Sequence, residues 1–353
     1  MHHYFDTKMV RERLSLAKNI LSSNFGRLPF PYKLTFVLTY WCNYKCKTCN
    51  IWQKRPEDEL TTEEITTFFQ NSNRFNWIDF TGGEIWIRND FVSIVESSLK
   101  YCKNLALIHF PTNGYFTQKT VDGVKEIMKM NPPKLIITVS LDGDEETNDE
   151  VRGKKGGWKK QIETFRLLQE IKGVEVVLGM TLSKHNAGKY QQTFEAVKRV
   201  LPDLNPRDFH VNIAHESSHF YNNGANELRD VSSEKIIAAE LKQYQKLRGI
   251  TRGPVSFLEN QYLGKVEKYL ETGKTPVRCH SLNASCFIDS WGTVYPCVTY
   301  DKKLGSLRDH NFDLGKIWNL PETKKLQQEI WQGQCPQCWQ PCEAYQSILG
   351  NLV

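Results

Sequence analysis

The chain has 353 residues, of which 40% are hydrophobic and 24% charged, and its formal net charge is +6. These values are ordinary for a globular protein with one large domain and a smaller one, and the mild charge makes nucleic-acid binding unlikely. No apolar run approaches the roughly 18 residues of a membrane span, and the N-terminus lacks the apolar segment of a secretory signal. We therefore expect a cytoplasmic protein without a membrane span.

The N-terminal segment, residues 1–32, is predicted to be a helical extension, because its apolar residues have helical spacing. From residue 33 to about 217, strand-like segments alternate with helix-like segments. Their apolar runs are nearly continuous, which favours parallel strands buried on both faces. The predicted strands are 33–40, 77–83, 105–114, 134–143, 174–183 and 208–215.

Six strand–helix repeats predict a parallel sheet with right-handed crossovers. A partly closed barrel and an open doubly wound sheet both fit this count, and in either one the functional groups lie at the carboxyl ends of the strands. After residue 217 two helices are expected, followed from residue 275 by a turn-rich, cysteine-dense region. We divide the chain into an extension (1–32), a core (33–250) and a C-terminal domain (251–353).

The chain has ten cysteines, and clustered thiols in a reducing compartment indicate metal or redox chemistry. Cys42, Cys46 and Cys49 follow the first predicted strand with C-x3-C-x2-C spacing. Three thiolates in a short loop can bind three corners of an iron–sulfur cubane and leave the fourth iron open, as catalytic metal sites do. A zinc knuckle completed by a distant Cys or His is the alternative.

This loop after the first strand of a βα repeat resembles the radical S-adenosylmethionine (SAM) superfamily. The resemblance implies a partial (β/α)6 TIM-like barrel and a [4Fe-4S] cluster whose open iron binds SAM. It also implies reductive cleavage of SAM to a 5′-deoxyadenosyl radical that abstracts hydrogen from a substrate. The residue before the third cysteine is commonly bulky in this superfamily and is Thr48 here.

Other motifs at predicted strand ends match the same superfamily. The sequence TGGE (81–84) resembles its GGE motif, in which the acidic residue would hold the amino group of SAM. Further contacts are expected from TNG (112–114) and SLDG (140–143), whereas Arg152 could equally contact SAM or lie on the surface. The implied SAM-binding residues are Gly82, Gly83, Glu84, Asn113, Ser140 and Asp142.

Six cysteines follow residue 275: Cys279, Cys286, Cys297, Cys335, Cys338 and Cys342. Their arrangement around a predicted β-hairpin resembles the Twitch and SPASM extensions of radical SAM enzymes, which bind auxiliary [4Fe-4S] clusters. Six thiols cannot fully ligate two cubanes, so we expect one auxiliary cluster on Cys279, Cys297, Cys335 and Cys338. Cys286 or Cys342 could replace one of these ligands. Two incompletely ligated clusters and a zinc ribbon are the alternatives.

The resemblance implies an oxidoreductase or maturase that uses SAM, a SAM-binding cluster and an auxiliary cluster. The short N-terminal segment favours oxidation or modification of a small molecule, and a peptide- or protein-modifying SPASM maturase is the alternative. A non-catalytic zinc or redox protein is a remote alternative. A low-potential electron donor such as flavodoxin or ferredoxin is the implied partner. The sequence identifies neither a catalytic residue nor the substrate.

Overall fold

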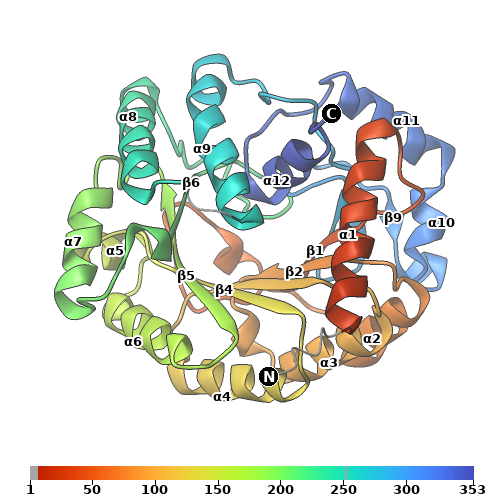
Figure 1. The fold of residues 1–353 in the computed structure, drawn as a ribbon, viewed down its shortest axis with the longest axis horizontal. Coiled ribbons are helices and arrows are strands. Elements are labelled where there is room, and N and C mark those ends of the chain that lie inside the picture. The colour runs from red at the N-terminus through yellow and green to blue at the C-terminus, as the bar shows by residue number, and fades with distance from the viewer. Residues whose placement is uncertain (1–6, 251–252) are drawn as a thin grey trace.

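The computed structural model describes residues 7–250 and 253–353, and the helix of the predicted extension is present within them. The residues just after the predicted boundary at 250, namely 251–252, and the start of the extension, 1–6, lie outside the described residues. The described strands form one sheet in the order β6-β5-β4-β3-β2-β1-β7-β8-β9 (Figure 1). The strands are β1 (Lys33–Thr39), β2 (Trp77–Gly82), β3 (Leu107–Thr112), β4 (Lys134–Ser140), β5 (Val174–Leu182), β6 (Phe209–Ile213), β7 (Ser285–Ile288), β8 (Thr293–Tyr295) and β9 (Gly305–Ser306).

Strands β1 to β7 pair in parallel, and β8 and β9 add antiparallel to the edge formed by β7. The edge strands β6 and β9 do not pair with each other within this sheet, so it is a partial barrel, as the sequence predicts. All six strands predicted before residue 217 are confirmed.

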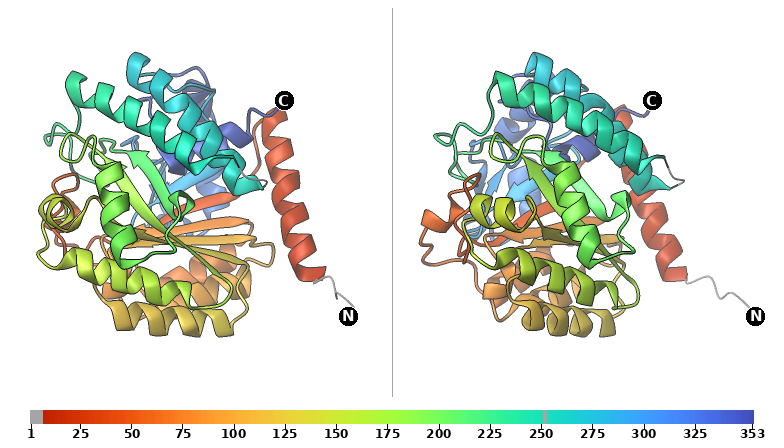
Figure 2. Two further views of the ribbon diagram at one scale, coloured as in Figure 1. Left: turned by 60° about the vertical axis from the view of Figure 1, so that its left-hand side comes forward. Right: turned by 90° about the vertical axis from the view of Figure 1, so that its left-hand side faces the viewer.

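The helices that follow β1 to β5 pack along the outer face of the sheet (Figures 1 and 2). Helix α2 begins at Thr61 with a capping box, in which Glu64 N donates to Thr61 Oγ1 and Thr61 N donates to the Glu64 carboxylate. The α-helices are α1 (Thr7–Phe25), α2 (Thr62–Asn71), α3 (Phe91–Tyr101), α4 (Thr117–Lys129), α5 (Glu145–Val151), α6 (Gly157–Gln169), α7 (Tyr190–Val200), α8 (Val231–Arg248), α9 (Pro254–Thr272), α10 (Leu314–Trp318), α11 (Pro321–Trp331) and α12 (Pro341–Leu349).

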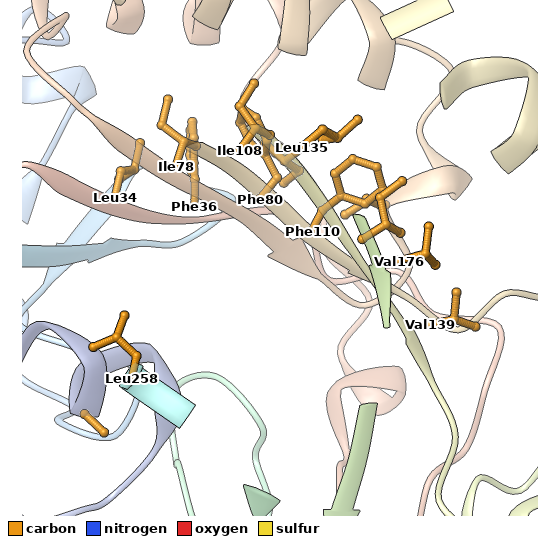
Figure 3. Packing of buried hydrophobic residues seen from close by; sticks show 14 of the residues in the cluster. Leu34, Phe36, Ile78, Phe80, Ile108, Phe110, Leu135, Val139, Val176 and Leu258 are labelled. Atoms are coloured by element: carbon orange, nitrogen blue, oxygen red, sulfur yellow. The ribbon is translucent and has the colours of Figure 1, made fainter. Parts of the chain in front are cut away.

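The core lies between the sheet and these helices. Alternate residues of successive strands, including Leu34, Ile78, Ile108 and Leu135, are fully buried in one hydrophobic cluster (Figure 3). Because side chains alternate along a strand, the intervening residues face the inside of the partial barrel.

The inside of the barrel carries charge. Lys33 Nζ is fully buried and lies 2.9 Å from Asp79, which in turn is 3.3 Å from the ring of His109. Burial favours the neutral carboxyl of Asp79, but the charges of Lys33 and His109 outweigh it and hold its pKa below the usual value. Strand β1 is buried along its whole length, whereas β3, β4 and β6 alternate between buried and partly exposed residues, so the expected burial on both faces holds for β1 and not for those three strands.

Strand β3 contains Pro111 although it lies within the sheet, a position where proline usually removes a ladder hydrogen bond. It is tolerated because the pairing of β2 with β3 stops at Asp79 and His109, before the proline. The two strands therefore separate towards their carboxyl ends, where a functional side chain can enter.

The C-terminal cysteine-rich region extends the same sheet. β7 pairs with β1, and the predicted hairpin turns at Gly292, whose φ of 83° suits glycine. The placement of domain boundaries stays a prediction. In the described part of the chain, no helix is both long and apolar enough to cross a membrane.

Candidate functional site

The first cysteine loop connects β1 to α2 and carries its three thiols at the carboxyl end of β1. The thiols are close enough for the charge of Cys46 to raise the pKa of both Cys42 and Cys49, although burial is the main cause. The pKa of Cys42 is raised to about 12. Thiols whose pKa is raised in this way stay protonated at neutral pH until a bound metal displaces the protons.

The chemistry of this loop fits a cluster better than a single ion. Among the described residues, no three His, Cys, Asp or Glu side chains converge closely enough to hold one metal ion. The ligands of a cubane bind different irons, so their sulfur atoms need not converge on one point. Three grouped, partly buried thiols on one loop fit that requirement, and Cys42, Cys46 and Cys49 would hold the cluster.

The GGE motif at the end of β2 packs closely against the cysteine loop. Gly83 N donates to Thr39 O and Glu84 N donates to Trp41 O, both over 2.8 Å. A Cβ atom on Gly82 would lie 2.3 Å from Thr39 O, and one on Gly83 would lie 2.1 Å from Trp41 O. Only glycine therefore allows the two segments to approach this closely.

Glu84 occupies the gap where β2 and β3 separate. Its carboxylate accepts hydrogen bonds from Asn113 N at 2.7 Å, Thr112 Oγ1 at 2.9 Å and Trp86 N at 3.3 Å. Burial raises its pKa to about 6 against the lowering effect of these bonds. The side chain of Asn113 also donates to Asn43 inside the cysteine loop at 2.7 Å. Glu84 and Asn113 are thus brought beside the three thiols.

Ser140 and Asp142 lie at the next strand end. Ser140 is half-buried and opposite Gly179 in the register of β4 and β5. Asp142 is buried, accepts from Thr181 N at 2.9 Å and pairs with Arg152 at 2.6 Å. Both carboxylate oxygens are therefore engaged within the protein, which favours a role in positioning Arg152.

Arg152 is the basic residue of this site, and the suggestion that it lies on the surface is wrong. Its side chain is only 11% exposed and lies 5.4 Å from the ring of Tyr44. Burial lowers its pKa, but Cys46 and Asp142 outweigh that effect and raise it above the usual value. A fixed cation beside Cys46 suits a site that accumulates thiolate and carboxylate charge.

A segment that the sequence analysis did not assign, residues 217–226 after β6, holds the cysteine loop from the other side. Tyr221 O accepts from Asn50 N at 2.9 Å, and Asn223 and Asn226 donate their side-chain amides to Thr48 O and Lys47 O at 2.8 Å. We call residues 217–226 the asparagine segment. In the sequence, the Asn-rich run YNNGAN could have indicated this segment.

The later cysteines form a second group, drawn from separate parts of the chain. Cys338 and Cys297 are near enough to raise the pKa of Cys279 further, although burial is again the main cause. Cys335 lies near the same place, since its charge and that of Cys297 both raise the pKa of Tyr300. These four thiols fit an auxiliary cluster as grouped donors, of which Cys297 and Cys338 are buried and Cys279 and Cys335 are partly buried.

Cys286 and Cys342 have different neighbours. Apart from burial, the pKa of Cys286 responds to Glu343 and Lys33, and that of Cys342 responds to Lys33, Asp79 and Glu343. Neither set of causes includes another cysteine, but that of Cys335 includes none either, so this comparison does not separate the candidate ligands. The ligand set remains a prediction.

Comparison with known families decides the class of protein. Residues 36–197 match the Radical SAM superfamily, and residues 279–339 match the SPASM iron–sulfur cluster-binding domain. The chain is a radical SAM enzyme with a SPASM-type domain. Its cofactors are SAM, the SAM-binding [4Fe-4S] cluster and an auxiliary [4Fe-4S] cluster.

The chain is also similar to individual proteins. It is 22% identical over 298 residues to the sporulation killing factor maturation protein SkfB of Bacillus subtilis, covering 83% of this chain and 67% of SkfB. It is 26% identical over 325 residues to the AdoMet-dependent heme synthase of Methanosarcina barkeri, covering 87% and 88% of the two chains. The structure of Streptococcus suis SuiB bound to precursor peptide SuiA matches with a TM-score of 0.59 at 15% identity, covering 89% of this chain and 70% of SuiB.

Proposed function

We propose that this radical SAM enzyme carries out an oxidative modification of a peptide. This reverses the order of the sequence-based preference, in which a small molecule came first and a peptide second. The support is that SkfB is named as a maturation protein and SuiB was solved with a precursor peptide.

One structural observation supports an oxidative outcome in particular. The asparagine segment contacts both cysteine groups, through Asn223 to Thr48 O in the first loop and through Ser217 Oγ to Val298 O beside Cys297 at 2.5 Å. A substrate held against this segment would lie within reach of both groups. When bound, the first cluster supplies the electron that cleaves SAM, and the second can accept the electron left on the substrate.

The residues of the first site would have separate tasks. Cys42, Cys46 and Cys49 would hold the cluster, and Glu84 would accept hydrogen bonds from the amino group of SAM. Asp142 would keep Arg152 oriented beside Cys46, where its charge offsets that of the thiolates. Ser140, Asn113 and the two glycines would complete the SAM contacts. A flavodoxin or ferredoxin would deliver the electron.

The test is deuterium transfer. Peptides deuterated at candidate carbon atoms are incubated with reconstituted enzyme, SAM and reductant, and the 5′-deoxyadenosine formed is examined by mass spectrometry. Deuterium in the 5′-deoxyadenosine and a product lighter by two hydrogens are expected. A protein that binds one zinc ion per chain and forms no 5′-deoxyadenosine would contradict the proposal that the chain cleaves SAM.

A second candidate is modification of a porphyrin, since the heme synthase alignment covers most of both chains. The same assay with a deuterated porphyrin separates the two candidates. Transfer from the porphyrin and from no peptide would replace the proposal with the second candidate.

A further inference from the structure

A cavity of about 410 Å³ opens beside the hairpin β7–β8. It is bordered by Lys54, which follows the first cysteine loop, by His219 of the asparagine segment, and by the hairpin β7–β8 with the loop after it. The family resemblance and the SAM-contact motifs do not assign it a ligand.

Residues next to the cavity link it to both cysteine groups. Tyr40 stacks on Trp291 with ring centroids 4.8 Å apart, and Lys54 Nζ lies 4.1 Å from the centre of the Tyr40 ring. The hydrophobic cluster that contains Tyr40 and Tyr295 also packs against Cys42 and Cys49. On the other side, the backbone of Cys297 lies close enough to His219 to affect its pKa. A ligand here would therefore be adjacent to both candidate cluster sites.

The acidic groups of the cavity are already engaged. Asp289 Oδ1 accepts from Trp291 N at 3.0 Å and from Thr293 N at 2.8 Å, which fixes the turn of the hairpin. Asp301 accepts from Ser218 Oγ at 3.0 Å. Their charges balance those of the two lysines, so a ligand would be selected by hydrogen bonds and not by net attraction of anions.

The donor groups, in contrast, have unused capacity. Among the described residues neither Lys54 nor Lys303 has a carboxylate within salt-bridge distance, and the hydrogen bond that Lys54 makes goes to His219 O. His219 stacks on Tyr295 with ring centroids 4.4 Å apart and is only 9% exposed. Neither of its ring nitrogens has a hydrogen-bond partner within 3.5 Å, although the backbone of Cys297 lies near one side of the ring and raises its pKa. Unpaired buried polar groups are costly, so their persistence in a cavity points to a ligand.

We propose that this cavity binds a carboxylate group of the substrate, with Lys54 and Lys303 donating to its two oxygens and His219 donating from its ring N–H. The proposal rests on the proposed function, because the carboxylate would belong to an acidic side chain or C-terminus of the peptide. A carboxylate takes two or more donors at once, and ionised partners make the stronger hydrogen bonds. Carboxylate binding would hold the neighbouring part of the peptide between the two clusters.

The test measures binding by calorimetry to the reconstituted full chain with SAM. The probes are acetyl-glutamate methylamide, acetyl-glutamine methylamide and coproporphyrin III, a porphyrin tetracarboxylate. Lys54→Gln and Lys303→Gln remove one donor charge each, and Lys302→Gln makes the same change at a neighbouring lysine that does not border the cavity. His219→Phe keeps the ring stacked on Tyr295 but removes its nitrogens.

The glutamate probe should bind at least tenfold more tightly than the glutamine probe. Lys54→Gln, Lys303→Gln and His219→Phe should each weaken the glutamate probe roughly tenfold, as expected for one charge-assisted hydrogen bond. Lys302→Gln should leave the affinity unchanged, and the circular dichroism of all variants should match that of the original chain.

Two other outcomes separate the site from the proposed function. If only the porphyrin binds, and does so with the same lysine dependence, the carboxylate site is supported and the peptide substrate is overturned. If the glutamate and glutamine probes bind equally, if the lysine variants change nothing, or if no probe binds at about 10 mM, the carboxylate site is overturned. Deuterium transfer from a peptide would still uphold the proposed function in that case.

Discussion

The two cysteine groups differ in how the chain builds them. The first lies within eight residues of one loop, from Cys42 to Cys49, and strand ends and the asparagine segment support that loop from outside. The second collects Cys279, Cys297, Cys335 and Cys338 from separate segments that meet only after the chain has folded. A local site can lose its cluster without losing the barrel, whereas a distributed site cross-links the region that carries it. Metal binding should therefore contribute to activity at the first group and to folding at the second.

The largest effect is expected from changing Cys42, Cys46 and Cys49 together to Ala. Reconstituted enzyme should hold roughly 8 irons per chain, and the variant should hold roughly half as many because the auxiliary cluster remains. Formation of 5′-deoxyadenosine should disappear, while thermal unfolding stays close to that of the original chain. A variant that unfolds would contradict the contrast between the two groups.

Cys338→Ala tests the second group. It should also lower the iron content by up to half, and in addition it should increase amide hydrogen exchange across β7, β8 and α11, because the cross-link between these segments is weakened. Cys342→Ala is the matched control, since Cys342 follows closely in the chain but lies outside the expected ligand set. Equal iron loss in both variants would show that the ligand set is wrong.

Lys33→Met tests the stability of the barrel independently of either cluster. Removing Lys33 takes from the buried carboxylate of Asp79 its nearest charged partner, which should cost about 3–5 kcal/mol of unfolding free energy in the apo protein. Adding Asp79→Leu should restore much of that loss. Urea denaturation measures both changes, and an unchanged midpoint for Lys33→Met would contradict the buried ion pair.

The ion pair of Lys33 and Asp79 should also make the stability of the protein depend on pH in the acid range. The pKa of Asp79 lies below its usual value because Lys33 and His109 outweigh its burial. Its contribution to stability is therefore complete above the unfolded-state pKa of about 3.9 and is lost as pH falls below that value towards the folded-state pKa. Stability of Asp79→Asn should depend less on pH in this acid range than that of the original chain. If the stability of Asp79→Asn and that of the original chain change in parallel with pH, Asp79 makes no such contribution.

The smallest effect is expected from Asn223→Ala. The change removes hydrogen bonds to Thr48 O and His215 O and should cost about 1–2 kcal/mol. Because Thr48 lies in the first cysteine loop, iron should be released faster from the SAM-binding cluster than from the auxiliary cluster under chelator. Asn222→Gly is the control, since the Asn222 side chain makes none of these bonds and glycine tolerates its φ of 52°. Equal release from both clusters would contradict the supporting role of the asparagine segment.

Much of the fold was predictable because its signals are local. The six strands follow from apolar runs, the start of α2 from Thr61 and Glu64, and the first cysteine loop from spacing alone. The inward-facing ion pair of Lys33 and Asp79 was not predictable, since it depends on the register of β1 with β2. The same holds for the asparagine segment, whose bond from Asn223 to Thr48 spans 175 residues. The extension of the sheet by β7 next to β1 likewise follows only from tertiary pairing.

The most direct test of the central contrast is electron paramagnetic resonance of the reduced, reconstituted enzyme with and without SAM. An open iron at the first group and a fully ligated cluster at the second predict that SAM changes one component of the spectrum and leaves the other unaltered. In the Cys42, Cys46 and Cys49 triple variant, the component that responds to SAM should be absent and the other retained. A signal in that variant that still shifts with SAM would contradict the account.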